Sequence, residues 1–299
     1  MIEAVPGPVR QMEQSPTVSF EALLPAEMAA KAEQVGVKKS NMEADRLFTL
    51  AVLAGAFIAL GAAFATTVAA GAEGRLPYGV TRLLAGTVFS LGLILVIVGG
   101  AELFTGNNLI VMAWASRNVT TGQLLRNWAI AYVGNFVGAI ATALIVFVTG
   151  QFRFGAGSVG LVALKTAELK CELGFVQAVA LGTLCNALVC LAVWLTFSAR
   201  STSDRILAIV PPISAFVAMG FEHSIANMYF VPIGLFIKGW APAAFWEAAN
   251  VNASDFPHVT WSAFLVNNLL PVTIGNIIGG GFLVGAVYWF VYLRTKQTG

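Results

Sequence analysis

Two stretches of sequence decide how this chain folds: Gly99-Gly-Ala-Glu-Leu-Phe-Thr-Gly-Asn107 and Gly220-Phe-Glu-His-Ser-Ile-Ala-Asn227. They interrupt the apolar segments 79–115 and 206–237, and each places a glutamate five residues before an asparagine. Each segment is too long for one straight membrane helix, which needs about 20 apolar residues, and too short for two crossings and a turn. We therefore predict that each segment is a single span broken near the membrane centre.

The composition requires a membrane environment. The 299 residues are 58% hydrophobic and 11% charged, whereas about 25% of the residues in an average soluble domain are charged. A soluble domain of this length cannot bury so much apolar surface, so the excess must face lipid. Further runs long enough for a helical span are 47–72, 124–148, 175–197 and 263–293. Together with the broken segments, they predict an all-α membrane protein with six transmembrane helices.

A second pattern repeats in the same order as the first. Gly134-Asn-Phe-Val-Gly138 lies in the third span and Gly275-Asn-Ile-Ile-Gly279 in the sixth. Two repeated patterns predict a duplicated three-helix unit, over about 47–150 and 174–293. Three is odd, so the copies lie inverted in the membrane, and broken second and fifth helices at matching positions of inverted repeats indicate the binding site. We expect the paired glycines to allow close helix packing.

The ends of the chain are expected to lie in the cytoplasm. Residues 1–46 are polar and lack a signal-peptide pattern, and within them 20–37 is expected to form an amphipathic helix along the membrane surface. Lysines and arginines are more numerous on the side of both termini, which predicts that side to be cytoplasmic. The channel domain then covers 47–293, the tail 294–299 is short, and 238–261 is expected to form an external cap.

Acid–base residues at membrane depth mark a solute path, because a charge there is costly. They are Glu102, Glu222 and His223. A histidine changes charge near neutral pH, so His223 can give a proton to an anion, and the neutral acid crosses an apolar gate more easily than the ion. The alternative is an ordinary hydrogen-bonded core histidine. For both glutamates we favour a structural role, in which they bind the N–H groups freed by the breaks.

Neighbouring residues supply further candidates. The Thr105 hydroxyl can donate to a solute or to His223, and Lys165 and Lys170, before the fourth span, can gather anions. Apolar side chains near the breaks are candidates for gates or for ordinary core: Phe89, Leu93, Leu103 and Phe216.

Other functions lack their signatures. Cys171, Cys185 and Cys190 form no CxxC pair, so we expect no disulfide framework, metal or cofactor. No Walker A, GxGxxG, HExxH or GxSxG motif occurs, which argues against an enzyme. The net charge of +2 argues against a nucleic-acid partner. The two Asn-Pro-Ala loops of an aquaporin and the paired pore histidines of an ammonium channel are also missing.

The broken segments and the spans that follow resemble the formate/nitrite transporter family. The resemblance extends over nearly all of the chain after residue 20 and is carried by Phe89-Ser-Leu-Gly-Leu-Ile-Leu95, Gly100-Ala-Glu-Leu-Phe-Thr-Gly-Asn107, Cys185-Asn-Ala-Leu-Val-Cys-Leu-Ala-Val-Trp194, Gly220-Phe-Glu-His-Ser-Ile-Ala-Asn-Met228 and Leu270-Pro-Val-Thr-Ile-Gly-Asn-Ile-Ile-Gly-Gly280. It implies an aquaporin-like six-helix protomer in a homopentamer of the bacterial inner membrane, each with its own pore. The implied substrate is formate, with nitrite or hydrosulfide as alternatives.

The resemblance also implies roles for individual residues. His223 would be the central histidine, with Thr105 as its partner, Asn186 orienting this centre beside Glu222, and Lys170 near the outer vestibule. The implied constrictions, on opposite sides of His223, are Phe89 with Leu93 and Phe216, and Leu103 with Val189. The amphipathic helix resembles a segment implicated in gating. The long connection after Pro232 resembles the formate-channel branch, whereas Gly106-Asn-Asn108 departs from it and leaves the preferred anion open.

Overall fold

The computed structural model describes residues 21–294. Long apolar helices dominate it. Five are long and apolar enough to cross a membrane: α2 (Ala44–Ala69), α3 (Tyr78–Gly99), α6 (Thr121–Val148), α8 (Phe175–Ser198) and Ala263–Tyr292. The last is continuous and consists of the π-helix η4 (Ala263–Leu269), α12 (Leu270–Ile277), the π-helix η5 (Ile278–Ala286) and α13 (Val287–Tyr292).

The second and fifth spans are broken, as predicted. After α3 the chain resumes as α4 (Phe104–Asn107), η1 (Asn108–Ile110) and α5 (Val111–Ala115), and after α9 (Thr202–Ala218) it resumes as α10 (Ser224–Trp240). Gly100 has φ of 82° and Gly220 has φ of 74°. This left-handed backbone is costly for a residue with a Cβ, which explains why each break begins with a glycine.

The repeated glycines bring helix backbones into direct contact, as expected. A Cβ on Gly138 of α6 would lie 1.9 Å from the Val52 oxygen of α2, and one on Gly279 of η5 would lie 2.0 Å from the Thr183 oxygen of α8. Neither distance is possible, so only glycine permits these crossings. The third span packs on the first, and the sixth on the fourth, in the same way.

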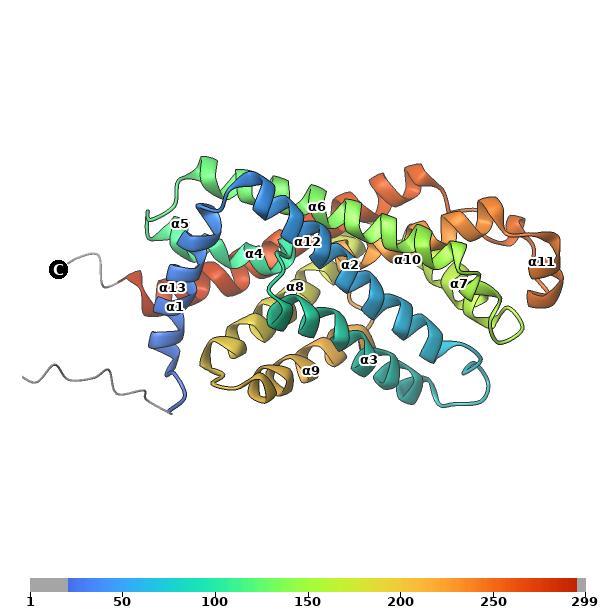
Figure 1. Ribbon diagram of the computed structural model, residues 1–299, viewed down its shortest axis with the longest axis horizontal. Helices are drawn as coiled ribbons and strands as arrows, with labels where there is room; N and C mark the ends of the chain where they lie inside the picture. Colours follow the sequence, from blue (N-terminus) through green and yellow to red (C-terminus); the bar gives the residue numbers. More distant parts are fainter. Residues whose placement is uncertain (1–20, 295–299) are drawn as a thin grey trace, which may run out of the picture.

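The N-terminal helix α1 (Pro25–Ser40) lies across one end of the molecule, beside α8 and α13 (Figure 1). It begins later than expected because Pro25 occupies its first position, where a missing N–H costs nothing. It ends at Ser40 rather than at residue 37, and residue 20 lies outside the described residues. Lys31 Nζ donates to the Phe197 oxygen at 2.9 Å. Burial, followed by the charges of Arg200 and Arg205, lowers the pKa of Lys31.

The opposite end carries α7 (Ser158–Cys171), preceded by η2 (Gln151–Arg153), and the cap (Figure 1). The cap contains α11 (Ala243–Ala249), bent by 114° from α10, and η3 (Ala253–Asp255). Lys238 Nζ donates to the Phe256 oxygen at 2.7 Å and to the Val259 oxygen at 3.1 Å, which ties the returning chain to α10.

Candidate functional site

The two broken spans meet at one hydrogen bond. His223 is the N-cap of α10, and its Nδ1 accepts from the Ala226 N–H at 3.0 Å. Its Nε2 lies 3.0 Å from Thr105 Oγ1, and both residues are buried. Because Nδ1 accepts a backbone N–H, the neutral ring carries its proton on Nε2 and donates it to Thr105. The Thr105 hydroxyl hydrogen is then free to bond a solute.

Thr105 is held from the side of α8. Asn186 Nδ2 and Cys190 Sγ both reach the Thr105 carbonyl oxygen at 3.3 Å. Asn186 Nδ2 also donates to Asn108 Oδ1 at 2.9 Å and to the Asn276 oxygen at 2.7 Å. Asn186 therefore holds the loop of Thr105, the partner of His223 in the centre that the resemblance implies Asn186 helps to orient.

Asparagines cap the broken helices, which is the role we expected of the glutamates. The Phe104 N–H donates to Asn135 Oδ1 at 2.9 Å, and the Ser224 N–H donates to Asn276 Oδ1 at 2.9 Å. The Nδ2 groups of these asparagines return to the breaks, to the Glu102 oxygen at 2.9 Å and the Glu222 oxygen at 3.0 Å. The available signal was a buried asparagine in both Gly-Asn patterns, because a buried amide needs partners.

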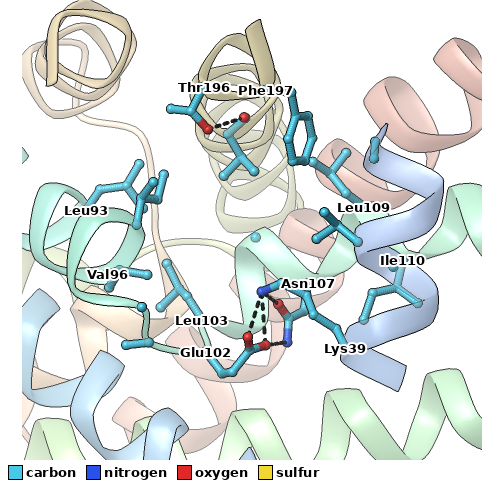
Figure 2. A pocket seen from close by; sticks show the side chains of 18 residues that line it. Lys39, Leu93, Val96, Glu102, Leu103, Asn107, Leu109, Ile110, Thr196 and Phe197 are labelled. Atoms are coloured by element: carbon cyan, nitrogen blue, oxygen red, sulfur yellow. Dashed lines mark hydrogen bonds and ion pairs between the residues drawn. The ribbon is translucent and has the colours of Figure 1, made fainter. Parts of the chain in front are cut away.

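The glutamates instead bind lysines. Lys39 Nζ, on α1, contacts Glu102 Oε1 at 2.9 Å and Asn107 Oδ1 at 2.9 Å, and Asn107 Nδ2 donates to Glu102 Oε2 at 2.9 Å (Figure 2). The expectation that the carboxylates bind backbone N–H groups was therefore wrong: the lysine and the asparagine amide take up the Glu102 oxygens.

A matching cluster lies toward the end of the molecule that carries α7. Lys170 Nζ, on α7, contacts Glu222 Oε1 at 2.7 Å, and Asn227 Nδ2 donates to Glu222 Oε2 at 2.7 Å. Sequence reasoning missed Lys39. The sequence signal for Lys39 is its position: Lys39 and Lys170 each lie near the end of the helix that precedes one of the two three-helix units. We infer that the duplicated unit includes α1 and α7.

Two cavities approach the centre from opposite ends. The α1-side cavity, of about 280 Å³, is lined by Leu93, Val96 and Leu103 on one wall and by α1 and Leu109 on the other (Figure 2). The α7-side cavity, of about 430 Å³, is lined by both Phe89 and Phe216 as well as the residues of the second cluster.

The apolar candidates divide between these cavities differently from the expectation. Leu93 lies in the same wall as Leu103, one turn of α3 beyond Phe89, and not with Phe89 and Phe216. One turn is about 5.4 Å of helix, enough to cross from one cavity to the other. Val189 is 1% exposed and lies outside the lining of both cavities.

The α7-side wall continues to the imidazole. The Phe89 and Phe216 rings meet edge to face with centroids 5.6 Å apart, and Phe216 stacks on His223 at 5.9 Å. Leu103 follows Glu102 as His223 follows Glu222, so the matching position of the first half is apolar. The two halves thus supply one imidazole, which lines the α7-side cavity, and its partner Thr105 lies between Leu103 and Gly106, which line the α1-side cavity.

Comparisons with known proteins agree with this geometry. The family model of the formate/nitrite transporter matches residues 26–290. The chain is 47% identical to the formate channel FocA of Escherichia coli (strain K12), over 93% of this chain and 97% of that protein. It is 39% identical to the formate channel FocA of Haemophilus influenzae, over 90% and 94%.

A solved structure described as a pentameric formate channel with formate bound is 47% identical, with a TM-score of 0.80, over 84% of this chain and 98% of that chain. An ion channel of the FNT family is 27% identical, with a TM-score of 0.74, over 89% and 98%. Sequence and structure therefore agree over most of the chain, including both broken spans. The chain belongs to the formate/nitrite transporter family.

Proposed function

We propose that this protein conducts formate across the bacterial inner membrane, through one pore in each protomer of a homopentamer, with the α1 end in the cytoplasm. The observation that carries the proposal is the hydrogen bond between Thr105 and His223, between two cavities. The support from relatives is that two of them are named formate channels and that a similar structure is described as pentameric with formate bound. Formate crosses as the anion or as neutral formic acid, and no bond other than that to the proton changes.

The geometry assigns tasks along the path. In the α7-side cavity, Lys170 and Glu222 form an ion pair near His223. These polar groups and water in the cavity solvate an anion as it approaches the centre. The Thr105 hydroxyl donates to the carboxylate there, because its own acceptor lone pair is taken by His223 Nε2. Phe216 and Leu103 close the two sides with apolar surface, which makes passage of a bare charge costly.

Proton transfer to formate passes through the imidazole of His223. The neutral imidazole carries one proton, on Nε2, and giving it away would leave an anionic ring at membrane depth. A relay therefore first adds a proton at Nδ1, which breaks the bond to the Ala226 N–H. The ring then gives its Nε2 proton to Thr105 Oγ1 as the hydroxyl proton moves to formate, and the ring is left neutral with its proton on Nδ1. Acidification favours this sequence, and the neutral acid crosses Leu103 at lower cost than the ion.

The test is formate uptake by proteoliposomes that contain the purified pentamer. We expect labelled formate to enter faster than into protein-free liposomes, and excess unlabelled formate to compete more strongly than nitrite or hydrosulfide. Uptake equal to that of protein-free liposomes would refute conduction. Stronger competition by nitrite or hydrosulfide would keep the pore and reject formate as its preferred anion.

A further inference from the structure

We propose that Arg82 is the residue that draws anions into the α7-side cavity and supplies its net positive charge, a role that rests on the proposed conduction of formate. Arg82 lies in the second turn of α3, at the end of the molecule that carries α7, and it lines this cavity together with Lys170, Glu222 and His223. It is partly buried rather than fully exposed.

The guanidinium is fixed in place by the opposite broken helix. Arg82 Nε donates to the Ala218 oxygen at 3.2 Å, and Nη2 donates to the Val217 oxygen. These carbonyls belong to the last turn of α9, where a cation is favourable because the final oxygens lack helical partners. A Cβ on Gly86, one turn further along α3, would lie 2.6 Å from the Ser214 oxygen, so the two backbones touch beside Arg82.

In the α7-side cavity, the positive charge of Arg82 is not neutralised by an ion pair among the described residues. Lys170 is neutralised by Glu222 at 2.7 Å, and Lys165, outside the cavity, is neutralised by Glu73 at 2.6 Å. The bond to Lys165 also lowers the pKa of Glu73, so Glu73 remains charged. Within residues 21–294, no carboxylate forms an ion pair with Arg82. A guanidinium remains charged at any working pH, so the cavity holds one net positive charge.

The remaining donors can serve an anion directly. A guanidinium has five N–H groups, and the bonds to α9 use two of them. The remaining N–H groups can donate to a carboxylate, which is the chemical class of formate. The α1-side cavity has no counterpart, because its charged lining residues, Lys39 and Glu102, pair with each other. Glu222 lies 120 residues after Glu102, and the residue 120 positions after Arg82 is Thr202, in α9. The matching position of the second half is therefore uncharged.

The experiment compares charge variants in proteoliposomes, each first shown to be a pentamer by size-exclusion chromatography. Formate uptake is measured at low formate concentration, in about 10 mM and about 150 mM salt, where screening differs strongly. Arg82→Gln removes the charge but keeps an N–H donor for α9, and Arg82→Lys keeps the charge. Arg75→Gln is the matched control, because Arg75 is exposed at the same end and lies outside the cavity lining.

We expect Arg82→Gln to lower the uptake rate roughly three- to tenfold in low salt, with a smaller loss in high salt. Arg82→Lys should stay within about twofold of the unmodified protein, and Arg75→Gln should match it. The inference is overturned if Arg82→Gln keeps the full rate, if its loss is the same in both salts, or if Arg82→Lys is equally slow. A conducting unmodified protein with an unaffected Arg82→Gln variant refutes only the role of Arg82. No conduction by the unmodified protein refutes the proposed function itself.

Discussion

Replacing Asn276 with alanine tests whether the asparagine cap maintains the break in the fifth span. Asn276 is fully buried, accepts from the Ser224 N–H at 2.9 Å, and donates to the Gly182 oxygen at 2.9 Å and the Glu222 oxygen at 3.0 Å. Alanine leaves the Ser224 N–H and the Glu222 oxygen buried without partners, whereas the Gly182 oxygen lies within α8 and keeps its helical partner. Each of these two groups costs about 1–3 kcal/mol, so the free energy of unfolding should fall by roughly 2–6 kcal/mol.

The assay is equilibrium unfolding of the detergent-solubilised protein, followed by tryptophan fluorescence, together with formate uptake. Asn41→Ala is the matched control, because Asn41 is exposed and makes one side-chain bond, to Gln123. Its stability should change by about 0.5 kcal/mol or less. We expect Asn276→Ala to lose uptake as well, since the cap fixes the residue next to His223. An Asn276→Ala protein as stable as Asn41→Ala would refute the reasoning.

Two further substitutions test the packing and the centre. Gly279→Ala places a Cβ 2.0 Å from the Thr183 oxygen, so the yield of folded pentamer in size-exclusion chromatography should collapse, whereas Gly239→Ala, with open space around it, should be neutral; equal yields would contradict the packing account. Thr105→Val keeps the side-chain volume but removes the hydroxyl 3.0 Å from His223 Nε2, so formate uptake should fall about tenfold or more, and Thr105→Ser should retain it. A valine variant with normal uptake would remove the hydroxyl from the mechanism.

Local sequence patterns were enough to predict the six spans, both breaks and the inverted repeat. Glu102 and Asn107 lie five residues apart, as do Glu222 and Asn227. Each pattern lies within one apolar segment, so it predicts the backbone break of that segment without information from distant residues. The glycine pairs predicted close packing because a residue without a side chain allows the backbones of membrane helices to approach each other closely.

The partners of these residues were harder to predict because they come from distant elements. Lys39 lies 63 residues from Glu102, on a helix outside the spans, so no local pattern connects them. Asn135 lies on the span that follows the break it caps, 31 residues from Phe104. Leu93 was placed with the wrong wall because a shift of one helical turn along α3 decides which cavity a side chain lines.

The most direct test of the central claim is the pH dependence of formate uptake in proteoliposomes with the substitution His223→Phe. His258→Phe is the matched control, because His258 is exposed in the cap, pairs with Glu168 of α7 and lies outside the lining of both cavities. We predict that uptake by the unmodified protein and by His258→Phe rises as the pH falls, and that His223→Phe loses this rise. An unchanged pH dependence in His223→Phe would contradict the account that formate passes through a centre formed by the two broken helices and one imidazole.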